Sequence, residues 1–474
     1  MGAPPAKALR ERLRSAFFAP TGAESLNLFR FLFCASVAYT IWTRPAGPVL
    51  AVLERYPETF RPIRYFALLG LGPPSPSTFL ALRYAVLASL ICAAAGLLTR
   101  LALCASWTLF FFYWGTALSA FRPPHTDSVN QQTEAVMWVL LILAVSPGVG
   151  LWGADGLIAR KGRWRLPPEL SSTIPSWPIQ TIRLLLGLVY FGAAYCKLRY
   201  SLRWADGIAL QSILLKKALQ DDLPLGWGLA PHLLPCAALS VLTLVLEGTF
   251  FMIIPFPALL PWYAAAGLGM HAGMWATTGL NYFRYFATMY WALLPWPWRV
   301  QARRGSRPAA REPRPAYAAA FIVVLAAGQL YSVFANYRAW PFTSWRFYSE
   351  RERYSDIAAY RVQGVARSGE RRWLGPEEIL EGPVVLSNSI DFALRAGDRR
   401  WLDDRFRVIV SELRRRGNPR DYASLVVVKR GIRRTQEGSF ESVDAPLFRR
   451  PVEQAPTADR VTGRRPTGSR SRAW

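Results

Sequence analysis

Two side chains that can take up or release a proton lie in or beside long apolar stretches of the chain. Lys197 is one of only six lysines, and His271 is the one histidine of three that an apolar stretch surrounds. Ionisable groups in such settings are costly and usually have a function or a specific partner. A lysine in an apolar pocket loses its proton more readily, because removal from water disfavours the ammonium form. The two residues are therefore predicted to form a functional site, with Lys197 as the catalytic base and His271 as its catalytic neighbour.

Other polar side chains are predicted at the same depth as Lys197 and His271. Asn281 opens a later apolar stretch from that side, and a further stretch is preceded there by Asn130, Gln131 and Gln132. Convergence of polar groups from several helices at one depth is typical of a binding site in a helical bundle. A second interpretation stays open for His271, since buried histidines also form purely structural hydrogen bonds between helices.

The apolar residues that surround these groups occur in blocks of about twenty, the length that crosses about 30 Å of hydrocarbon as a helix. Apolar residues make up 52% of the whole chain, and this composition excludes a disordered protein. The net charge of +26 suits a nucleic-acid binder, but the basic residues are spread among loops, so no nucleic-acid partner is expected. We predict nine membrane spans, at 25–43, 79–98, 101–121, 135–152, 177–195, 233–254, 257–275, 282–297 and 316–335.

The distribution of arginine and lysine between the loops predicts the orientation, because cytoplasmic loops carry the excess. Basic clusters around Lys7, around Lys161 and between Arg299 and Arg314 fall on one side if the amino terminus is cytoplasmic. The basic start of the chain precedes a long apolar run without a small-residue cleavage site, which favours a retained anchor. An odd number of spans then places everything after Ala335 outside, and the protein is expected as a multi-pass protein of the cell membrane.

The segment after the last predicted span has a different composition and predicts a small α+β domain. Strands are expected at 383–386 and 424–429, and a helix at 402–416 with Asp403 or Asp404 near its start and Gly417 past its end. The fold class is thus an all-α polytopic membrane protein of about nine transmembrane helices with a small C-terminal extracytoplasmic α+β domain. The predicted parts are a basic cytoplasmic terminus, the transmembrane domain, the outer domain and a disordered tail, at 1–24, 25–335, 336–453 and 454–474.

Glu247 lies well inside the sixth predicted span, with only apolar neighbours in sequence. A lone carboxylate in hydrocarbon becomes protonated or recruits a partner. We therefore expect a basic or hydrogen-bonding residue from another span within reach, with Arg30 or Arg183 as the first candidates. Four arginines lie near predicted span ends: Arg30, Arg83, Arg183 and Arg284. The alternative for them is that their side chains extend to the lipid headgroups and form no pair inside the bundle.

One stretch, YFGAAYCKLRYSLRWADGIAL at 190–210, resembles a family signature. The family is that of the vitamin K-dependent γ-carboxylases and their bacterial HTTM relatives, in which a helix ends in Lys-Leu followed by a Trp and a Gly. The matching residues are Lys197, Leu198, Trp204 and Gly207. Three further stretches agree in order: FRFLFCASVAY, GLLTRLAL and GMHAGMWATTGLNYFRYFATMYWALL. The motif WPFTSWRFYSE looks like the start of the extramembrane part in bacterial members. The similarity covers 26–350.

The resemblance implies a carboxy-lyase-type membrane enzyme whose cofactor is a reduced quinone. In that chemistry the lysine, here Lys197, deprotonates the quinone. Oxygen converts the quinone to an epoxide, and the strong base so formed removes a glutamate γ-proton before carbon dioxide adds. His271 would orient the hydroquinone or stabilise its anion. Four residues are expected to bind the cofactor: Trp204, Asn281, Asn130 and Gln131.

Two other functions remain open at the level of sequence. A non-catalytic protein of the same fold would bind lipid or assist assembly of an extracytoplasmic partner. A quinone-reactive subunit of a respiratory or sulfur-oxidising complex is also compatible, because GLLTR resembles DoxX-like proteins. A cavity shared by Lys197 and His271 would favour the catalytic interpretation. The expected partners are the lipid bilayer, a quinone or lipid-like small molecule and an extracytoplasmic protein substrate, and no metal site is expected.

The predicted topology can be tested with a reporter that is active only in the cytoplasm, fused after Trp474. Nine spans with an internal amino terminus place this fusion point outside, so the reporter should be silent. The same reporter placed before residue 25 is the positive control. Reporter activity after Trp474 would mean an even number of spans.

Overall fold

A computed structural model of the protein describes residues 11, 14–121, 131–160, 173–200, 204–284, 286–294, 316–335, 337–339, 342–343, 357–380, 383–417, 420–434 and 440–452. The chain forms two compact units. Unit 1 comprises Met1–Ala358 and Gly431–Ser442, and unit 2 comprises Ala359–Arg430 and Val443–Trp474. The predicted domain boundary at Asn336, the tail from Gln454 and the basic clusters used for orientation lie outside the described residues.

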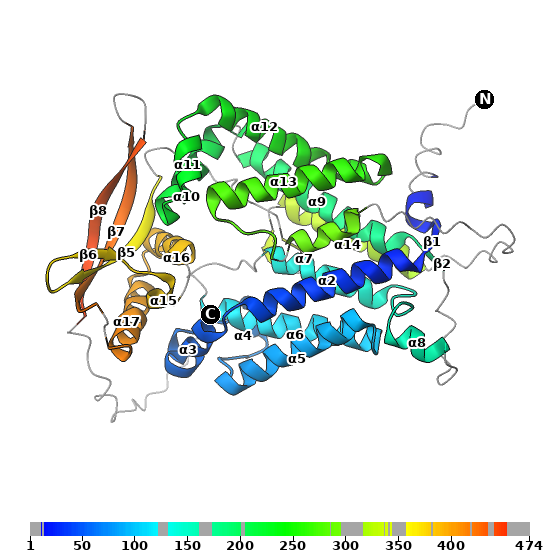
Figure 1. The fold of residues 1–474 in the computed structure, drawn as a ribbon, viewed down its shortest axis with the longest axis horizontal. Coiled ribbons are helices and arrows are strands. Elements are labelled where there is room, and N and C mark those ends of the chain that lie inside the picture. The colour runs from blue at the N-terminus through cyan, green and yellow to red at the C-terminus, as the bar shows by residue number, and fades with distance from the viewer. Residues whose placement is uncertain are drawn as a thin grey trace, which may run out of the picture. The chain divides into compact units, whose positions relative to one another are not determined.

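Unit 1 is built almost entirely of helices, and its long helices run side by side (Figure 1). Two short antiparallel strand pairs, β1 with β2 and β3 with β4, join segments of this unit. Its elements are β1 (Pro20–Gly22), α2 (Ala23–Thr43), α3 (Gly47–Arg55), η1 (Pro57–Thr59), α4 (Arg64–Leu68), α5 (Pro76–Ala95), α6 (Thr99–Ala120), α7 (Gln131–Val145), α8 (Ala154–Arg160), β2 (Thr173–Pro175), α9 (Trp177–Tyr200), α10 (Ile208–Asp221), α11 (Pro224–Leu229), α12 (Leu233–Thr249), η3 (Phe250–Ile253), η4 (Pro257–Leu259), α13 (Leu260–Thr278), η5 (Phe286–Leu293), α14 (Ala316–Ala335), β3 (Arg338–Ala339) and β4 (Phe342–Thr343).

Each of the nine predicted spans contains a described helix, but the helices differ in length and polarity. Six are long and apolar enough to cross a membrane: Ala23–Thr43, Pro76–Ala95, Thr99–Ala120, Trp177–Arg199, Leu233–Ile253 and Ala316–Ala335. The other three are α7 with 15 residues, α13 with 19 but less apolar, and η5 with 8. At about 2 Å per residue a 3₁₀-helix such as η5 covers roughly 16 Å, which is too short to span hydrocarbon alone.

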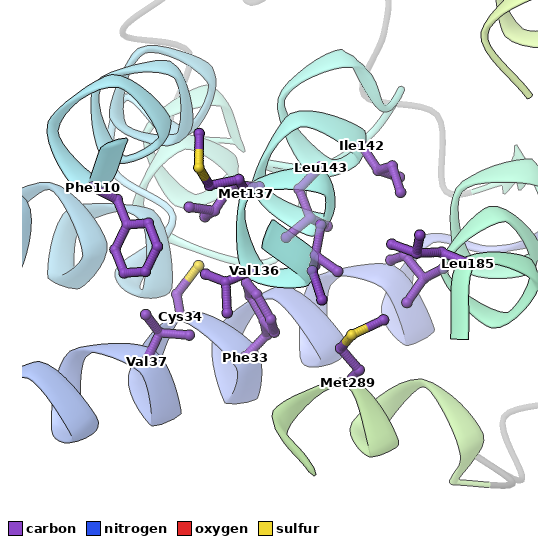
Figure 2. Packing of buried hydrophobic residues seen from close by; sticks show 14 of the residues in the cluster. Phe33, Cys34, Val37, Phe110, Val136, Met137, Ile142, Leu143, Leu185 and Met289 are labelled. Carbon is purple, nitrogen blue, oxygen red and sulfur yellow. The ribbon is translucent and has the colours of Figure 1, made fainter. Parts of the chain in front are cut away.

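The short helix α7 is interior to unit 1, and this explains why its sequence is apolar on every side. Figure 2 shows side chains from α2, α6, α9 and η5 meeting those of α7. Val136, Val139 and Leu143 of α7 have no exposed surface. A helix surrounded by protein needs less length than one that faces lipid, because its neighbours exclude both water and lipid from its ends.

The GLLTR stretch has a packing function in the structure. Gly96 ends α5 with φ of +70°, and a Cβ there would lie 2.7 Å from the Arg30 guanidinium. Arg30 is only 1% exposed and donates to the Trp152 carbonyl at 2.7 Å and to Thr99 Oγ1 at 3.3 Å. The Asp155 carboxylate caps the start of α6, accepting from two backbone N–H groups at 2.8 Å and from the Thr99 hydroxyl at 2.7 Å. Arg30 is therefore held inside the bundle and does not reach the headgroups.

Unit 2 is an α+β structure with one four-stranded sheet in the order β6-β5-β7-β8. β5 pairs antiparallel with both β6 and β7, and α16 packs against β5. The elements that lie wholly or mostly in unit 2 are β5 (Ala359–Ala366), β6 (Arg371–Trp373), α15 (Pro376–Ile379), α16 (Pro383–Ala396), α17 (Arg399–Arg415), β7 (Tyr422–Arg434) and β8 (Phe440–Pro451).

The structure corrects two details predicted for this unit. The predicted strand at 383–386 is wrong, because these residues begin α16, whose apolar residues continue at helical spacing. The predicted strand at 424–429 is confirmed within β7. The predicted helix is confirmed as α17, but it begins earlier than expected, where Asp398 accepts from the Trp401 backbone at 2.9 Å. Gly417 follows the helix with φ of +80°, as expected for its end.

The capping contact of Asp155 predicts a measurable loss of stability in Asp155→Ala. Three hydrogen bonds at the start of α6 are lost, so the free energy of unfolding should fall by about 1–2 kcal/mol. Thermal unfolding in detergent would measure this as a lowered midpoint. Glu54→Ala is the control, because the Glu54 side chain is 64% exposed and its contact with Arg55 is 3.7 Å long. Equal midpoints for the two variants would contradict the capping role.

Candidate functional site

Lys197 and Glu247 form a buried ion pair between α9 and α12. The Lys197 Nζ atom lies 2.5 Å from both carboxylate oxygens of Glu247. The two residues are 3% and 5% exposed. The expectation that Glu247 recruits a basic partner from another span is therefore confirmed. The candidates Arg30 and Arg183 were wrong, since Arg183 instead donates to the Ala292 carbonyl at 2.9 Å.

This pairing could not be predicted from the sequence, because the depth of each residue in the membrane is then known only from the predicted ends of the spans. An error of a few residues shifts the depth by about 1.5 Å for each residue. A lysine side chain also extends several ångströms beyond its own backbone. The packing of the two helices decides which of their residues meet. α9 and α12 run antiparallel, so that Gly187 approaches Phe251 while Ala194 lies near Gly248.

The segment after α9 folds back over Lys197. The Trp204 ring lies 4.9 Å from the Lys197 Nζ atom and is itself buried. Gly207, at the start of α10, has φ of +82°, and a Cβ there would collide with the backbone of Ala237 on α12. The Lys, Trp and Gly of the signature stretch therefore belong to one local structural arrangement. The glycine permits the close turn that brings the tryptophan over the ammonium group.

A chain of three hydrogen-bonding side chains lies on the other side of the site. The Tyr190 hydroxyl is 2.6 Å from His271 Nε2 and also hydrogen-bonds the Tyr290 hydroxyl. All three residues are buried. Tyr190 precedes Lys197 by about two helical turns, so α9 presents both on similar faces. Gly267, one turn before His271, makes room for the Tyr290 hydroxyl, which any Cβ at this position would strike.

Lys197, Glu247, Trp204, Tyr190 and His271 all line one cavity of about 70 Å³. The cavity is large enough for several water molecules at roughly 10–15 Å³ each. His271 is 3% exposed, and its Nδ1 atom has no hydrogen-bond partner within the described part of the chain. The remaining lining is mostly apolar or aromatic and includes Leu210, Ile213, Met270, Met274, Tyr282 and Phe286.

The structure brings together some of the predicted site residues and separates others. Lys197, His271 and Trp204 share the cavity. Asn281 is not among its lining residues, and its side chain accepts from the backbone of Phe283 at 3.0 Å. Asn130 and the side chain of Gln131 lie outside the described residues.

Sequence reasoning missed three residues of the site: Tyr190, Tyr290 and, as the partner of Lys197, Glu247. A signal for Tyr190 was present, since its spacing from Lys197 matches two turns of one helix. Tyr290 carried no such signal, because η5 approaches α9 only through the tertiary packing of unit 1.

Buried ion pair, apolar cavity and long apolar helices together define a membrane-embedded helical protein with an internal polar site. The HTTM domain matches residues 18–295, which is more than half of the 474 residues. The chain therefore belongs to the HTTM family, in agreement with the resemblance found in its sequence. No curated protein and no solved structure matches the chain significantly.

The buried pair predicts strong coupling between substitutions at Lys197 and Glu247. Either Lys197→Met or Glu247→Leu leaves one charge buried alone, so each should lower the free energy of unfolding by about 3–5 kcal/mol. The double variant removes both charges and should be more stable than either single variant. Unfolding of all four proteins in detergent gives the coupling energy.

The control is the pair Arg367 and Asp421, whose side chains are 63% and 65% exposed. Single substitutions there should change stability by less than about 1 kcal/mol. Additive losses in the Lys197 and Glu247 double variant would show that the two residues are not an energetically coupled pair.

Proposed function

We propose that the cavity binds a reduced quinone or a closely similar lipophilic molecule, and that Lys197 carries out proton transfer on it. The observation that carries the proposal is the shared cavity: Lys197 and His271 come from different helices and line the same cavity. Two ionisable side chains facing one apolar cavity fit acid–base chemistry on a small molecule better than they fit the binding of a hydrocarbon chain.

The residues present fit a quinone. Its ring is flat and apolar, and its two oxygens lie at opposite ends of the ring. The aromatic side chains of Trp204, Tyr282 and Phe286 would contact the ring, while Lys197 and His271 would meet oxygen atoms. The buried Nδ1 atom of His271 has no hydrogen-bond partner in the described structure, which supports a polar ligand group as its partner. When bound, the reduced quinone would supply an acidic hydroxyl group and the electrons for a reaction with oxygen.

Glu247 provides a route by which Lys197 becomes a base. The ammonium proton can move along the 2.5 Å contact to the carboxylate, which leaves a neutral amine beside a neutral carboxylic acid. A low dielectric favours this neutral pair relative to separated charges. The amine can then accept a proton from a ligand hydroxyl within a cavity whose lining is mostly apolar.

The wider proposal is an enzyme of carboxylase type that crosses the membrane nine times. The amino terminus would be cytoplasmic and unit 2 would be extracytoplasmic, where a protein substrate could be modified. Membership of the HTTM family supports this chemistry by likeness, and the six helices that are long and apolar enough to cross a membrane support the location in a membrane.

A non-catalytic lipid-binding protein is the second candidate, and one observation favours it. The bidentate contact of Glu247 satisfies the charge of Lys197 within the protein, so the pair is stable without any chemistry. In that case the lysine would hold two helices together, and its substitution would alter stability alone.

Activity measurements on Lys197 variants test the proposal. Lys197→Ala should abolish turnover while membrane insertion persists, because one residue near a helix end contributes little to insertion. Lys197→Arg should also fail, since a guanidinium keeps its proton at accessible pH. The measurement compares epoxidised and reduced quinones, and carboxylated proteins, in cells that carry each variant.

Lys429→Arg is the matched control, because this exposed lysine lies on β7 of unit 2. It should be as active as the unaltered protein. A fully active Lys197→Arg protein would contradict the catalytic role and favour the lipid-binding candidate.

A further inference from the structure

We infer that neutral His271 carries its proton on Nδ1 and donates it to an acceptor oxygen of the ligand, with Tyr290 and Tyr190 setting this tautomer. The identity of the ligand as a quinone rests on the proposed function, whereas the tautomer rests only on the hydrogen-bond chain. His271 is thereby assigned as the group that binds an oxygen with partial or full negative charge. The base remains Lys197.

The direction of donation along the hydrogen-bond chain follows from a count of the available hydroxyl hydrogens. Tyr290, Tyr190 and His271 Nε2 are joined by two hydrogen bonds, and two hydroxyl hydrogens are available to make them. If Tyr290 donates to Tyr190 and Tyr190 donates to Nε2, both hydroxyl hydrogens are used. The ring proton is then on Nδ1, which is the atom without a partner in the described structure.

The opposite direction leaves more buried groups unsatisfied. If Nε2 donated to Tyr190 and Tyr190 donated to Tyr290, the Tyr290 hydroxyl hydrogen would lack an acceptor within the described part of the structure. Nδ1 would at the same time be an acceptor without a donor. Each unsatisfied buried group costs about 1–3 kcal/mol, so the first direction is favoured.

A doubly protonated His271 is disfavoured by its surroundings. Besides the tyrosines, the ionisable groups that line the cavity with it are Lys197 and Glu247, which neutralise each other. A second cation would be buried without a counter-charge, and its stacked neighbour Tyr282, with ring centroids 5.2 Å apart, offers no carboxylate. A neutral ring with one unpartnered donor in the described structure therefore remains.

This tautomer narrows the class of ligand. A donor at His271 requires an acceptor oxygen on the ligand, such as a carbonyl, hydroxyl, phenolate or carboxylate oxygen, and an alkyl chain would leave the Nδ1 hydrogen unsatisfied. In a proton transfer that Lys197 performs at one end of the molecule, the His271 donor would stabilise negative charge that develops on oxygen. Tyr190 and Tyr290 act through His271 and are positioning residues.

The tautomer can be measured directly, because the chain has only three histidines. Full-length protein labelled with ¹⁵N-histidine in nanodiscs gives few ring signals, and His271→Gln assigns those of His271. Two-bond couplings to the ring protons identify the protonated nitrogen. We expect Nδ1–H in the unaltered protein and a population of Nε2–H in Tyr190→Phe, which lacks the donor to Nε2.

Tyr195→Phe is the matched control on α9, because the Tyr195 hydroxyl accepts from Arg199 and does not line the cavity. It should keep the Nδ1–H tautomer. An Nε2–H or doubly protonated His271 in the unaltered protein would overturn the inference, even if Tyr190→Phe did not fold.

A ligand titration separates this inference from the proposed function. 1,4-Naphthoquinone should shift the protonated Nδ1 signal, whereas naphthalene, which has the same rings without oxygen, should not. Affinity for the quinone should fall about ten-fold in Tyr190→Phe, the loss expected for one hydrogen bond. An Nδ1–H tautomer whose signal ignores the quinone would refute the quinone ligand and leave the donor assignment standing.

Discussion

The site depends on the cost of placing charge where water is absent. Lys197 and Glu247 can both be ionised inside unit 1 only because each is the counter-charge of the other at 2.5 Å. The pair therefore ties α9 to α12 at one depth. The rest of the site follows from that contact, since Trp204 covers the ammonium and α9 carries Tyr190 about two turns away.

Close backbone approaches allow this arrangement. Gly207 lets the segment before α10 turn against α12, and Gly267 lets Tyr290 reach across α13 to Tyr190. In a membrane, helices gain little from burying apolar surface against each other, so close packing and interhelical hydrogen bonds decide their positions. The ion pair and the tyrosine chain are such interactions, and they place two different polar groups on one apolar cavity.

The ion pair and the hydrogen-bond chain have different roles in the proposed chemistry. The ion pair can hold a proton on nitrogen or on oxygen without changing its total charge. In the inferred tautomer, the hydrogen-bond chain occupies His271 Nε2 and leaves the proton of the neutral ring on Nδ1. A similar network elsewhere in unit 1, around Arg30 and Asp155, caps the start of a helix, so buried polar groups also serve the packing of this bundle.

Composition and the lengths of apolar blocks were enough to predict a helical membrane domain, because the thickness of hydrocarbon sets the length of its helices. The signature around Lys197 and the isolation of His271 in an apolar stretch were enough to select the two residues that share the cavity. A strand was expected where α16 begins, since a short apolar run has no period of its own. The partner of Glu247, the tyrosine chain and the exclusion of Asn281 from the cavity were decided by tertiary structure alone. Sequence spacing gives a position along one helix, whereas a contact between helices depends on their relative depth and rotation, which only the packing of the whole bundle determines.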